Sequence, residues 1–153
     1  MSSATPVPHA APVLPDLVPE LLVTDLATSL DFWVDLCGFQ ILYDRPAEGF
    51  AYLHLGTAHV MLDQIGLGRD WVSGPLEQPL GRGVNFQVSV PAIEPLIERM
   101  CAAGQPLILA PEDKWYPTGD SEAGLRQFLV QDPDGYLVRF AAPLPARDGF
   151  ATQ

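Results

Sequence analysis

The chain contains few basic residues, only two cysteines and no long apolar run. Eight lysines and arginines stand against 19 acidic residues among 153, which gives a formal net charge of −11. Because nucleic-acid phosphates repel such a charge, the composition argues against nucleic-acid binding and favours a cationic small-molecule partner. The charge by itself is equally compatible with an ordinary acidic protein, since many soluble proteins are acidic.

Motifs of several common enzyme classes are missing. There is no Gly-x-Ser-x-Gly elbow, phosphate-binding loop or dinucleotide fingerprint. No Cys-x-x-Cys spacing indicates a metal site, and we expect Cys37 and Cys101 to be small core residues near helix ends rather than a disulfide. Residues 1–16 have no basic start and no long apolar stretch, so we expect no signal peptide or membrane span and a cytoplasmic location.

What the sequence does contain is a duplicated pattern of a strand, a helix ended by glycine, and further strands. The first copy opens with residues 18–38 and the second with residues 83–104. Equivalent apolar positions of the two helical segments, Leu26 and Ile93, are 67 residues apart. Two copies of one unit in a short chain predict a pseudo-twofold architecture with a cleft between or inside the copies.

The repeat predicts an α+β fold of two tandem βαβββ units, with curved mixed sheets that form a concave cavity. At 153 residues, 48% of them hydrophobic, the chain is long enough for one domain or for two small halves that share a core. The expected divisions are a flexible tail or arm, the first unit, a linker, the second unit and a C-terminal tail, at residues 1–16, 17–66, 67–82, 83–143 and 144–153. Whether the units pair within one chain or across a swapped dimer stays open.

The two predicted helices start with different signals. Asp25 supplies an acceptor for the free amides of the first helix. The second helix is expected to start at Pro91, whose missing amide costs nothing in a first turn, and Pro95 could shift that start by a residue or two. Its buried face is expected to consist of Ile93, Ile97 and Met100.

An alternation of period two predicts the strands that follow each helix. They are expected at residues 39–43, 50–55, 59–63, 106–109, 125–131 and 136–142. The segment from Pro111 to Gly124 is expected to be a long loop, a kind of segment that often covers a binding site. The strongest turn signal is Asp132-Pro-Asp-Gly135, whose residue types each supply a backbone geometry that a hairpin needs.

Alternation also separates the two faces of each strand. The side chains expected to face the helices are Leu53, Leu55, Val60, Leu62, Val84, Phe86, Val88 and Val90. The opposite faces carry Tyr52, His54, His59, Met61, Asp63, Asn85, Gln87 and Ser89. If the sheets curl, these polar and aromatic side chains line a shared concave surface; if the sheets are flat, they form an ordinary solvated face.

Two groups of residues carry a family resemblance. They are Val23-Thr-Asp-Leu26, Leu30-Asp-Phe-Trp33 and Gly38-Phe39 in the first unit, and Phe128-Leu-Val-Gln-Asp-Pro-Asp-Gly135-Tyr136 with Phe140 in the second. With these residues the chain resembles the vicinal oxygen chelate superfamily, which includes glyoxalase I, extradiol dioxygenases, fosfomycin-resistance enzymes and bleomycin resistance proteins. The resemblance covers residues 18 to about 143 and implies the glyoxalase/bleomycin-resistance-like fold without specifying one activity.

Enzymes of this superfamily usually hold a divalent metal through side chains on the cavity-facing strands. Matched by motif, those positions fall on Val18, Met61, Asn85 and Arg139. Valine and methionine are poor ligands for a hard cation, and arginine has no lone pair to donate, so we expect no metal cofactor. A metal alternative would use the imidazoles and carboxylates of Glu20, His54, His59 and Asp63.

The resemblance is closest to the bleomycin resistance proteins, which lack a metal, form intertwined homodimers and bind a cationic glycopeptide antibiotic in an acidic, aromatic-lined crevice. It implies a dimeric protein without catalytic residues that sequesters a small cationic ligand and has no nucleic-acid or membrane partner. The candidate ligand-binding residues are Glu20, Tyr52, His54, Met61, Asp63, Asn85, Gln87, Trp115, Tyr116 and Arg139. Arg139 is expected either to pair with Glu20, Asp63 or Glu122 or to hold an anionic group of the ligand, and Arg126 could play the same part.

Two other functions stay open at this stage. One is a metal-dependent glyoxalase-type lyase or dioxygenase with non-standard ligands, which would retain bound metal on purification. The other is a scaffold or regulator without a small ligand, whose cavity would be filled by its own side chains.

Overall fold

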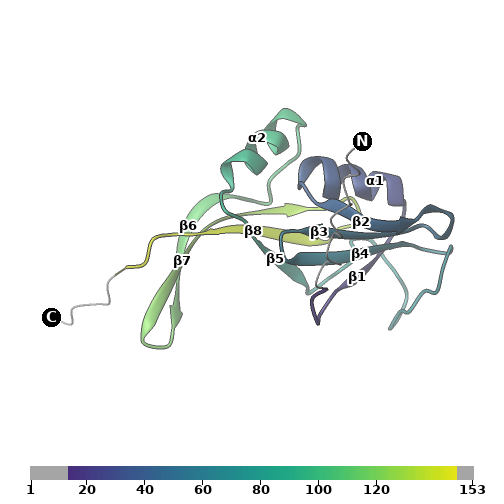
Figure 1. Ribbon diagram of the computed structural model, residues 1–153, viewed down its shortest axis with the longest axis horizontal. Coiled ribbons are helices and arrows are strands. Elements are labelled where there is room, and N and C mark those ends of the chain that lie inside the picture. Colours follow the sequence, from purple (N-terminus) through teal and green to yellow (C-terminus); the bar gives the residue numbers. More distant parts are fainter. Residues whose placement is uncertain (1–13, 148–153) are drawn as a thin grey trace, which may run out of the picture.

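The first unit forms a four-stranded sheet with one helical segment packed on it (Figure 1). The computed structural model describes residues 14–147, so most of the tail expected at residues 1–16 and part of the one at 144–153 lie outside the described residues. The elements are β1 (Glu20–Val23), α1 (Leu26–Leu30), η1 (Asp31–Leu36), β2 (Gln40–Arg45), η2 (Pro46–Glu48), β3 (Phe50–Leu55) and β4 (Ala58–Gln64). The strand order is β1-β4-β3-β2, with β1 parallel to β4 and the other pairs antiparallel.

The second unit repeats this topology. Its elements are β5 (Asn85–Ser89), α2 (Glu94–Ala102), β6 (Leu109–Thr118), β7 (Ser121–Gln131) and β8 (Leu137–Pro143). The strand order is β5-β8-β7-β6, again with one parallel pair, β5 with β8. The predicted α+β fold of two βαβββ units is confirmed.

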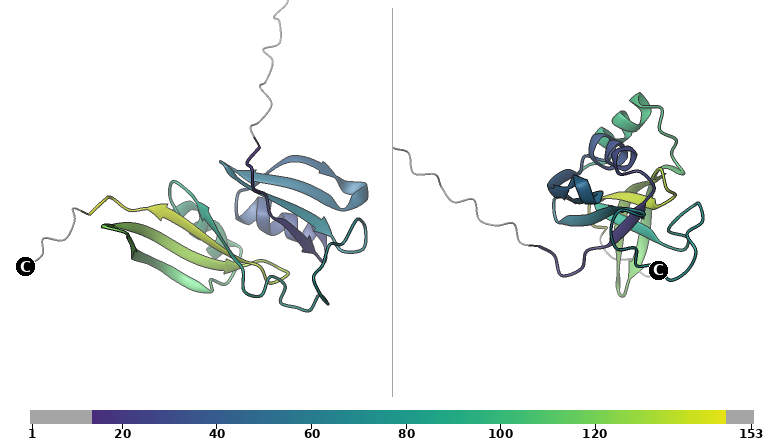
Figure 2. Two further views of the ribbon diagram at one scale, coloured as in Figure 1. Left: turned by 90° about the horizontal axis from the view of Figure 1, so that it is seen from below. Right: turned by 90° about the vertical axis from the view of Figure 1, so that its right-hand side faces the viewer.

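The two sheets lie side by side along the long axis of the molecule (Figures 1 and 2). The helices of both units lie on the same side of the sheets, above them in Figure 1, and α2 contacts η1. The sheet faces opposite the helices are therefore turned toward the same direction, as the view from below in Figure 2 shows. We call them the open face of the first sheet and the open face of the second sheet. They do not face each other within one chain.

The predicted signals mark the start of the first helical segment, which consists of α1 and η1, and the ends of both helical segments. The carboxylate of Asp25 accepts a hydrogen bond from the amide of Thr28 at 2.9 Å. Gly38 and Gly104, which follow the two helices, have φ angles of +83° and +68°, the left-handed conformation that ends a helix and favours glycine. The repeated glycine of the sequence therefore has the same structural role in both units.

Prolines account for two wrong predictions. The second helix begins at Glu94 rather than Pro91, because Pro95 occupies its first turn, where a missing amide is tolerated. The segment from Pro111 to Gly124 is not a loop but most of the long β6–β7 hairpin, and the strand expected at residues 106–109 begins only at Leu109. Since β6 is the edge strand of its sheet, its prolines remove no hydrogen bond to a further strand.

One continuous hydrophobic core lies between the sheets and the helices. Its buried side chains include Val23, Trp33, Leu53, Leu62, Val88, Ile93, Met100, Phe128, Val138 and Phe140. Cys37 is buried as expected, but Cys101 is exposed, because the residue after the buried Met100 turns away from the apolar side of α2. Val84, expected to face the helices, precedes β5 and is 48% exposed.

The Asp132-Pro-Asp-Gly135 turn joins the two units. One carboxylate oxygen of Asp132 accepts the amides of Asp134, Gly135 and Tyr136 at 3.0, 2.9 and 2.8 Å. The carboxylate of Asp134 accepts the amide of Thr24 from the end of β1, and the hydroxyl of Tyr136 donates to the carbonyl of Leu22 at 2.9 Å. The predicted hairpin turn thus also fixes the second unit against the first. None of the helices in residues 14–147 is both long and apolar enough to cross a membrane.

Candidate ligand-binding site

The open face of the first sheet carries a hollow of about 550 Å³, which we call the first-sheet crevice. Strands β1 to β4 supply its floor, and the loop after β4 supplies one wall. Its lining residues are Glu20, Tyr43, Arg45, Glu48, Phe50, Met61, Asp63, Leu67, Gly68, Arg69 and Trp71. Three of the predicted ligand-binding residues, Glu20, Met61 and Asp63, belong to this set.

Glu20 and Asp63 form an acidic pair in the first-sheet crevice. They come from the adjacent parallel strands β1 and β4, on which Glu20 is the register partner of Met61. Burial raises the pKa of Glu20, and the neighbouring Asp63 carboxylate raises it further. Within residues 14–147 neither acid forms an ion pair, because Arg45 binds Glu48 instead. The pair is therefore available to an incoming cation.

Aromatic side chains lie beside the acidic pair. The rings of Tyr43 and Tyr52 are stacked, with centroids 5.1 Å apart, and the ring of Phe50 lies 6.0 Å from that of Tyr43. The guanidinium carbon of Arg45 lies 3.8 Å from the centroid of Phe50. Such a set of rings can stack on a planar group or cover a cation.

Trp71 lies on the loop after β4, where two hollows meet. It lines the first-sheet crevice and also a hollow of about 440 Å³ between the linker and β1, and Glu20 lines both. Its side chain is 74% exposed. An exposed indole beside an unpaired carboxylate is a suitable surface for a planar cationic ligand.

The two histidines of the first sheet lie at the other end of β3 and β4. The Tyr52 hydroxyl and His59 Nδ1 are hydrogen-bonded at 2.9 Å, and the rings of His54 and His59 are 5.7 Å apart. Burial, followed by the charge of His54, lowers the pKa of His59. His59 is four residues from Asp63 along β4, and in residues 14–147 no three histidine, cysteine or acidic side chains gather as a metal site.

Asn85 and Gln87 lie on β5, away from the first-sheet crevice. Together with His59 they line a smaller hollow of about 310 Å³ between the two units. The fold thus separates these predicted site residues from the acidic pair.

The open face of the second sheet carries a polar network around Gln127, which is 3% exposed. Its side-chain amide donates to Glu112 at 3.0 Å and to the hydroxyl of Tyr116 at 2.8 Å. Arg139 Nη1 donates to Tyr116 and Gln127 at 3.4 and 3.3 Å, and its Nε is buried without a partner in the described part of the chain. Among residues 14–147 Arg139 forms none of the expected ion pairs with Glu20, Asp63 or Glu122.

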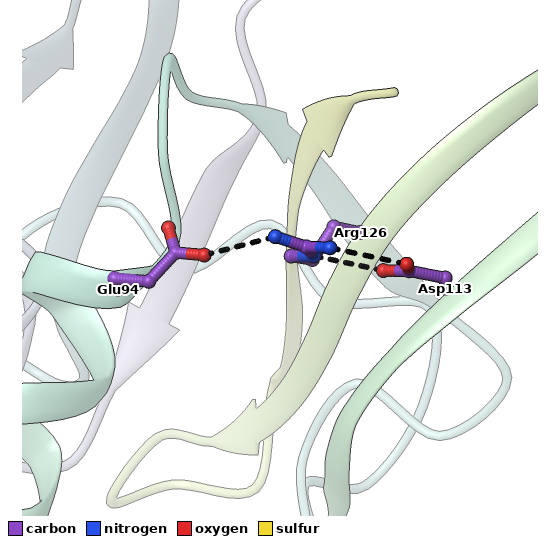
Figure 3. A network of polar contacts seen from close by, with 3 residues as sticks. All are labelled: Glu94, Asp113 and Arg126. Carbon is purple, nitrogen blue, oxygen red and sulfur yellow. Dashed lines mark hydrogen bonds and ion pairs between the residues drawn. The ribbon is translucent and has the colours of Figure 1, made fainter. Parts of the chain in front are cut away.

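Trp115 and Arg126 do not share this network. Trp115 packs against Gly124, with the guanidinium of Arg147 3.9 Å from its ring. Arg126 is held between Asp113, at 2.8 and 3.1 Å, and Glu94 of α2, at 3.3 Å (Figure 3). These ion pairs within the chain occupy the guanidinium of Arg126, which is therefore not free to hold an anionic group of the ligand.

Sequence reasoning missed Tyr43 and Arg45 as lining residues of the first-sheet crevice. The β2–β3 ladder shifts in register between Ile41 and Tyr43, so alternation counted from Phe39 does not give the face of the later residues. No local sequence signal marks this irregularity.

Comparison with known proteins gives the family. A family model described as the glyoxalase/bleomycin resistance protein/dioxygenase superfamily matches residues 8–140. The chain belongs to this superfamily. No curated protein sequence matches the chain.

Several proteins of solved structure are similar to this chain in sequence or in fold. TioX from Micromonospora sp. ML1 is 32% identical, with 84% of this chain and 98% of that chain covered and a TM-score of 0.61. A superfamily member from Vibrio splendidus 12B01 is 43% identical over 82% and 95% of the two chains, with a TM-score of 0.37. Virulence protein STM3117 from Salmonella typhimurium, 18% identical over 86% and 99% with a TM-score of 0.64, shares the fold.

The metal positions that the superfamily implies do not fit a divalent cation here. Met61 lies across from Glu20 on the first sheet, and Arg139 lies across from Gln87 on the second. Val18 precedes β1. A thioether is a poor ligand for a hard cation, and a permanently charged guanidinium repels one. No catalytic step through a metal follows from these residues.

Proposed function

We propose that this protein is a metal-independent, small-molecule-binding member of the superfamily, of the bleomycin-resistance type, which sequesters a cationic ligand without breaking a bond. The observation that carries the proposal is the acidic couple Glu20 and Asp63, without an ion-pair partner among the described residues, in a hollow of about 550 Å³ lined by aromatic rings. A cation next to these carboxylates gains electrostatic attraction, and a planar group gains contact area on Tyr43, Phe50 and Trp71.

The proposal includes a homodimer. Each chain leaves two open sheet faces turned toward the same direction (Figure 2). Half-buried apolar side chains lie on them by register: Leu22 is the partner of Asp63, Leu129 is the partner of Arg139, and Leu137 is two residues before Arg139. A second chain laid over these faces would remove apolar surface from water and would turn the open crevice into an enclosed one.

Calorimetric titration with bleomycin as a cationic glycopeptide probe tests the ligand class. We expect binding that weakens as salt is raised, because the attraction is electrostatic. Glu20→Gln should weaken binding about tenfold, whereas Glu98→Gln, the same charge change on an exposed position of α2, should leave it unchanged. No heat at micromolar protein would exclude this antibiotic as the ligand.

A metal-dependent lyase or dioxygenase is the alternative function. It predicts metal bound in near-stoichiometric amount when the protein is purified without chelator. Elemental analysis that finds less than about a tenth of an equivalent of zinc, iron, nickel or manganese would support the binding protein, and a full equivalent would overturn its metal independence.

A further inference from the structure

Arg139 and Arg126 differ in how their charges are compensated. Arg126 lies between the carboxylates of Asp113 and Glu94 (Figure 3). Arg139 donates hydrogen bonds to the neutral groups of Tyr116 and Gln127, and Gln127 in turn binds Glu112. Arg139 forms no ion pair with any acid in residues 14–147. Half-burial of a guanidinium whose buried Nε has no partner among the described residues costs desolvation free energy. A counter-charge supplied from outside the chain would offset this cost.

The first sheet presents the complementary situation. Glu20 and Asp63 are neighbouring acids without a base partner among the described residues. Residues 14–147 of each chain therefore carry an acidic pair without an ion-pair partner on one open face and a guanidinium without one on the other.

These charges occupy neighbouring positions of the repeat. Glu20 is the register partner of Met61 on the first sheet, and Gln87 is the register partner of Arg139 on the second. Glu20 and Gln87 are 67 residues apart, the same spacing as the helical positions Leu26 and Ile93. Superposition of the two units therefore places Arg139 at the position of Met61, which lies across from Glu20 and two residues before Asp63 on β4.

We infer that Arg139 pairs with Glu20 and Asp63 of the partner subunit, so that each crevice is completed by the second sheet of the other copy. The inference rests on the homodimer of the proposed function. The open faces of one chain point the same way, so a two-fold axis between two copies can lay each first sheet over the partner's second sheet. The two-fold symmetry repeats the contact, so that the acidic pair of each chain meets Arg139 of the partner subunit.

A second copy fits these charges better than an unrelated partner would. Each chain carries both the two acids and the guanidinium, with Asp63 and Arg139 on corresponding strands of the repeat. A two-fold interface between identical chains needs such a self-complementary surface. In this arrangement one guanidinium neutralises one of the two carboxylates. The acidic pair keeps one net negative charge beside Tyr43, Phe50 and Trp71 for a cationic ligand.

Charge exchange tests the inference on the full-length protein by sedimentation velocity over a dilution series. We expect a dimer for the unaltered chain and at least about tenfold weaker association for Arg139→Glu and for Glu20→Lys alone. The double variant Arg139→Glu/Glu20→Lys should recover most of the loss, because the pair is restored with its charges exchanged. Arg126→Gln is the matched control and should associate as the unaltered chain does.

The outcomes separate the inference from the proposed function. A dimer whose two single changes add in the double variant, without recovery, overturns the trans pair and leaves the dimer standing. A monomer at every concentration overturns both. If Arg139→Glu fails to fold, as judged by circular dichroism, Arg139→Gln and Glu20→Gln are measured singly and together in a double-mutant cycle. Losses of dimer affinity that do not add support the ion pair, and additive losses reject it.

Discussion

The indole nitrogen of Trp33 donates a hydrogen bond of 3.1 Å to the carboxylate of Asp132 across 99 residues of sequence. Trp33 lies on η1 of the first unit, and Asp132 opens the hairpin turn of the second. Both residues belong to the motifs that identify the superfamily. Here they join the two units to each other and lie outside the first-sheet crevice, which explains why these motifs specify a fold and not an activity.

Trp33→Phe should destabilise the protein by about 1 to 3 kcal/mol, because the substitution leaves a buried carboxylate oxygen without its donor. Denaturant unfolding followed by circular dichroism measures the change. Trp115→Phe, on the β6–β7 hairpin, is the control and should cost less than about 0.5 kcal/mol. Equal costs for the two substitutions would mean that the hydrogen bond to Asp132 contributes little.

Binding of a cationic ligand should strengthen as the pH rises through the weakly acidic range. Burial and Asp63 raise the pKa of Glu20. The partner's Arg139 offers one charge to two carboxylates, so the acidic pair still takes up a proton at pH values where an ordinary glutamate is charged. A bound cation favours the carboxylate, so binding releases that proton and affinity grows until Glu20 is fully ionised. Calorimetry with bleomycin between about pH 4 and 7 measures the slope.

Glu20→Gln should flatten this pH dependence, and Glu98→Gln should retain it. A Glu20→Gln protein with the original slope would assign the titration to another group.

Removal of the exposed indole in the first-sheet crevice should weaken ligand binding with little effect on stability. Trp71 is 74% exposed, so Trp71→Ala removes few folded-state contacts but a large part of the aromatic lining. We expect a loss of about tenfold in affinity, the value of one cation–π or stacking contact. Trp115→Ala, outside this crevice, should bind the ligand normally. If Trp115→Ala weakened binding and Trp71→Ala did not, the ligand site would lie in the second unit.

The two thiols should differ sharply in reactivity. Cys37 is fully buried, and burial raises the pKa of its thiol, whereas Cys101 is exposed on α2. A colorimetric disulfide reagent should therefore modify Cys101 rapidly in the native protein and Cys37 only on unfolding. Cys101→Ser should abolish the fast phase, and rapid modification of that variant would show that Cys37 is accessible.

The predicted elements were most accurate where local chemistry alone decides the backbone. The helix start at Asp25, the glycines that end both helices and the Asp132–Gly135 turn were all confirmed, because each depends on hydrogen bonds or φ angles within a few residues. The prediction failed for the segment from Pro111 to Gly124, since prolines exclude a central strand but not an edge strand. Edge position is a property of the whole sheet.

The candidate site was only partly accessible from the sequence. Alternation placed Tyr52, Met61 and Asp63 on the face opposite the helices, where the structure has them. It did not find Tyr43 or Arg45, because a register shift in the β2–β3 ladder changes which residues share a face. It also offered Glu20, Asp63 or Glu122 as partners of Arg139, and which acid a guanidinium meets depends on how the sheets are placed in space.

The amino-acid sequence by itself determined the duplicated βαβββ unit, the superfamily and the unsuitability of Met61 and Arg139 as metal ligands, because periodicity, turn chemistry and side-chain type are local properties. Only the tertiary structure decided that the two sheets lie side by side with both open faces turned the same way. That arrangement is fixed by contacts between the units, such as Trp33 with Asp132 and Thr24 with Asp134. It leaves Glu20 and Asp63 on one face and Arg139 on the other without ion-pair partners among residues 14–147, and no pattern within either unit could reveal this.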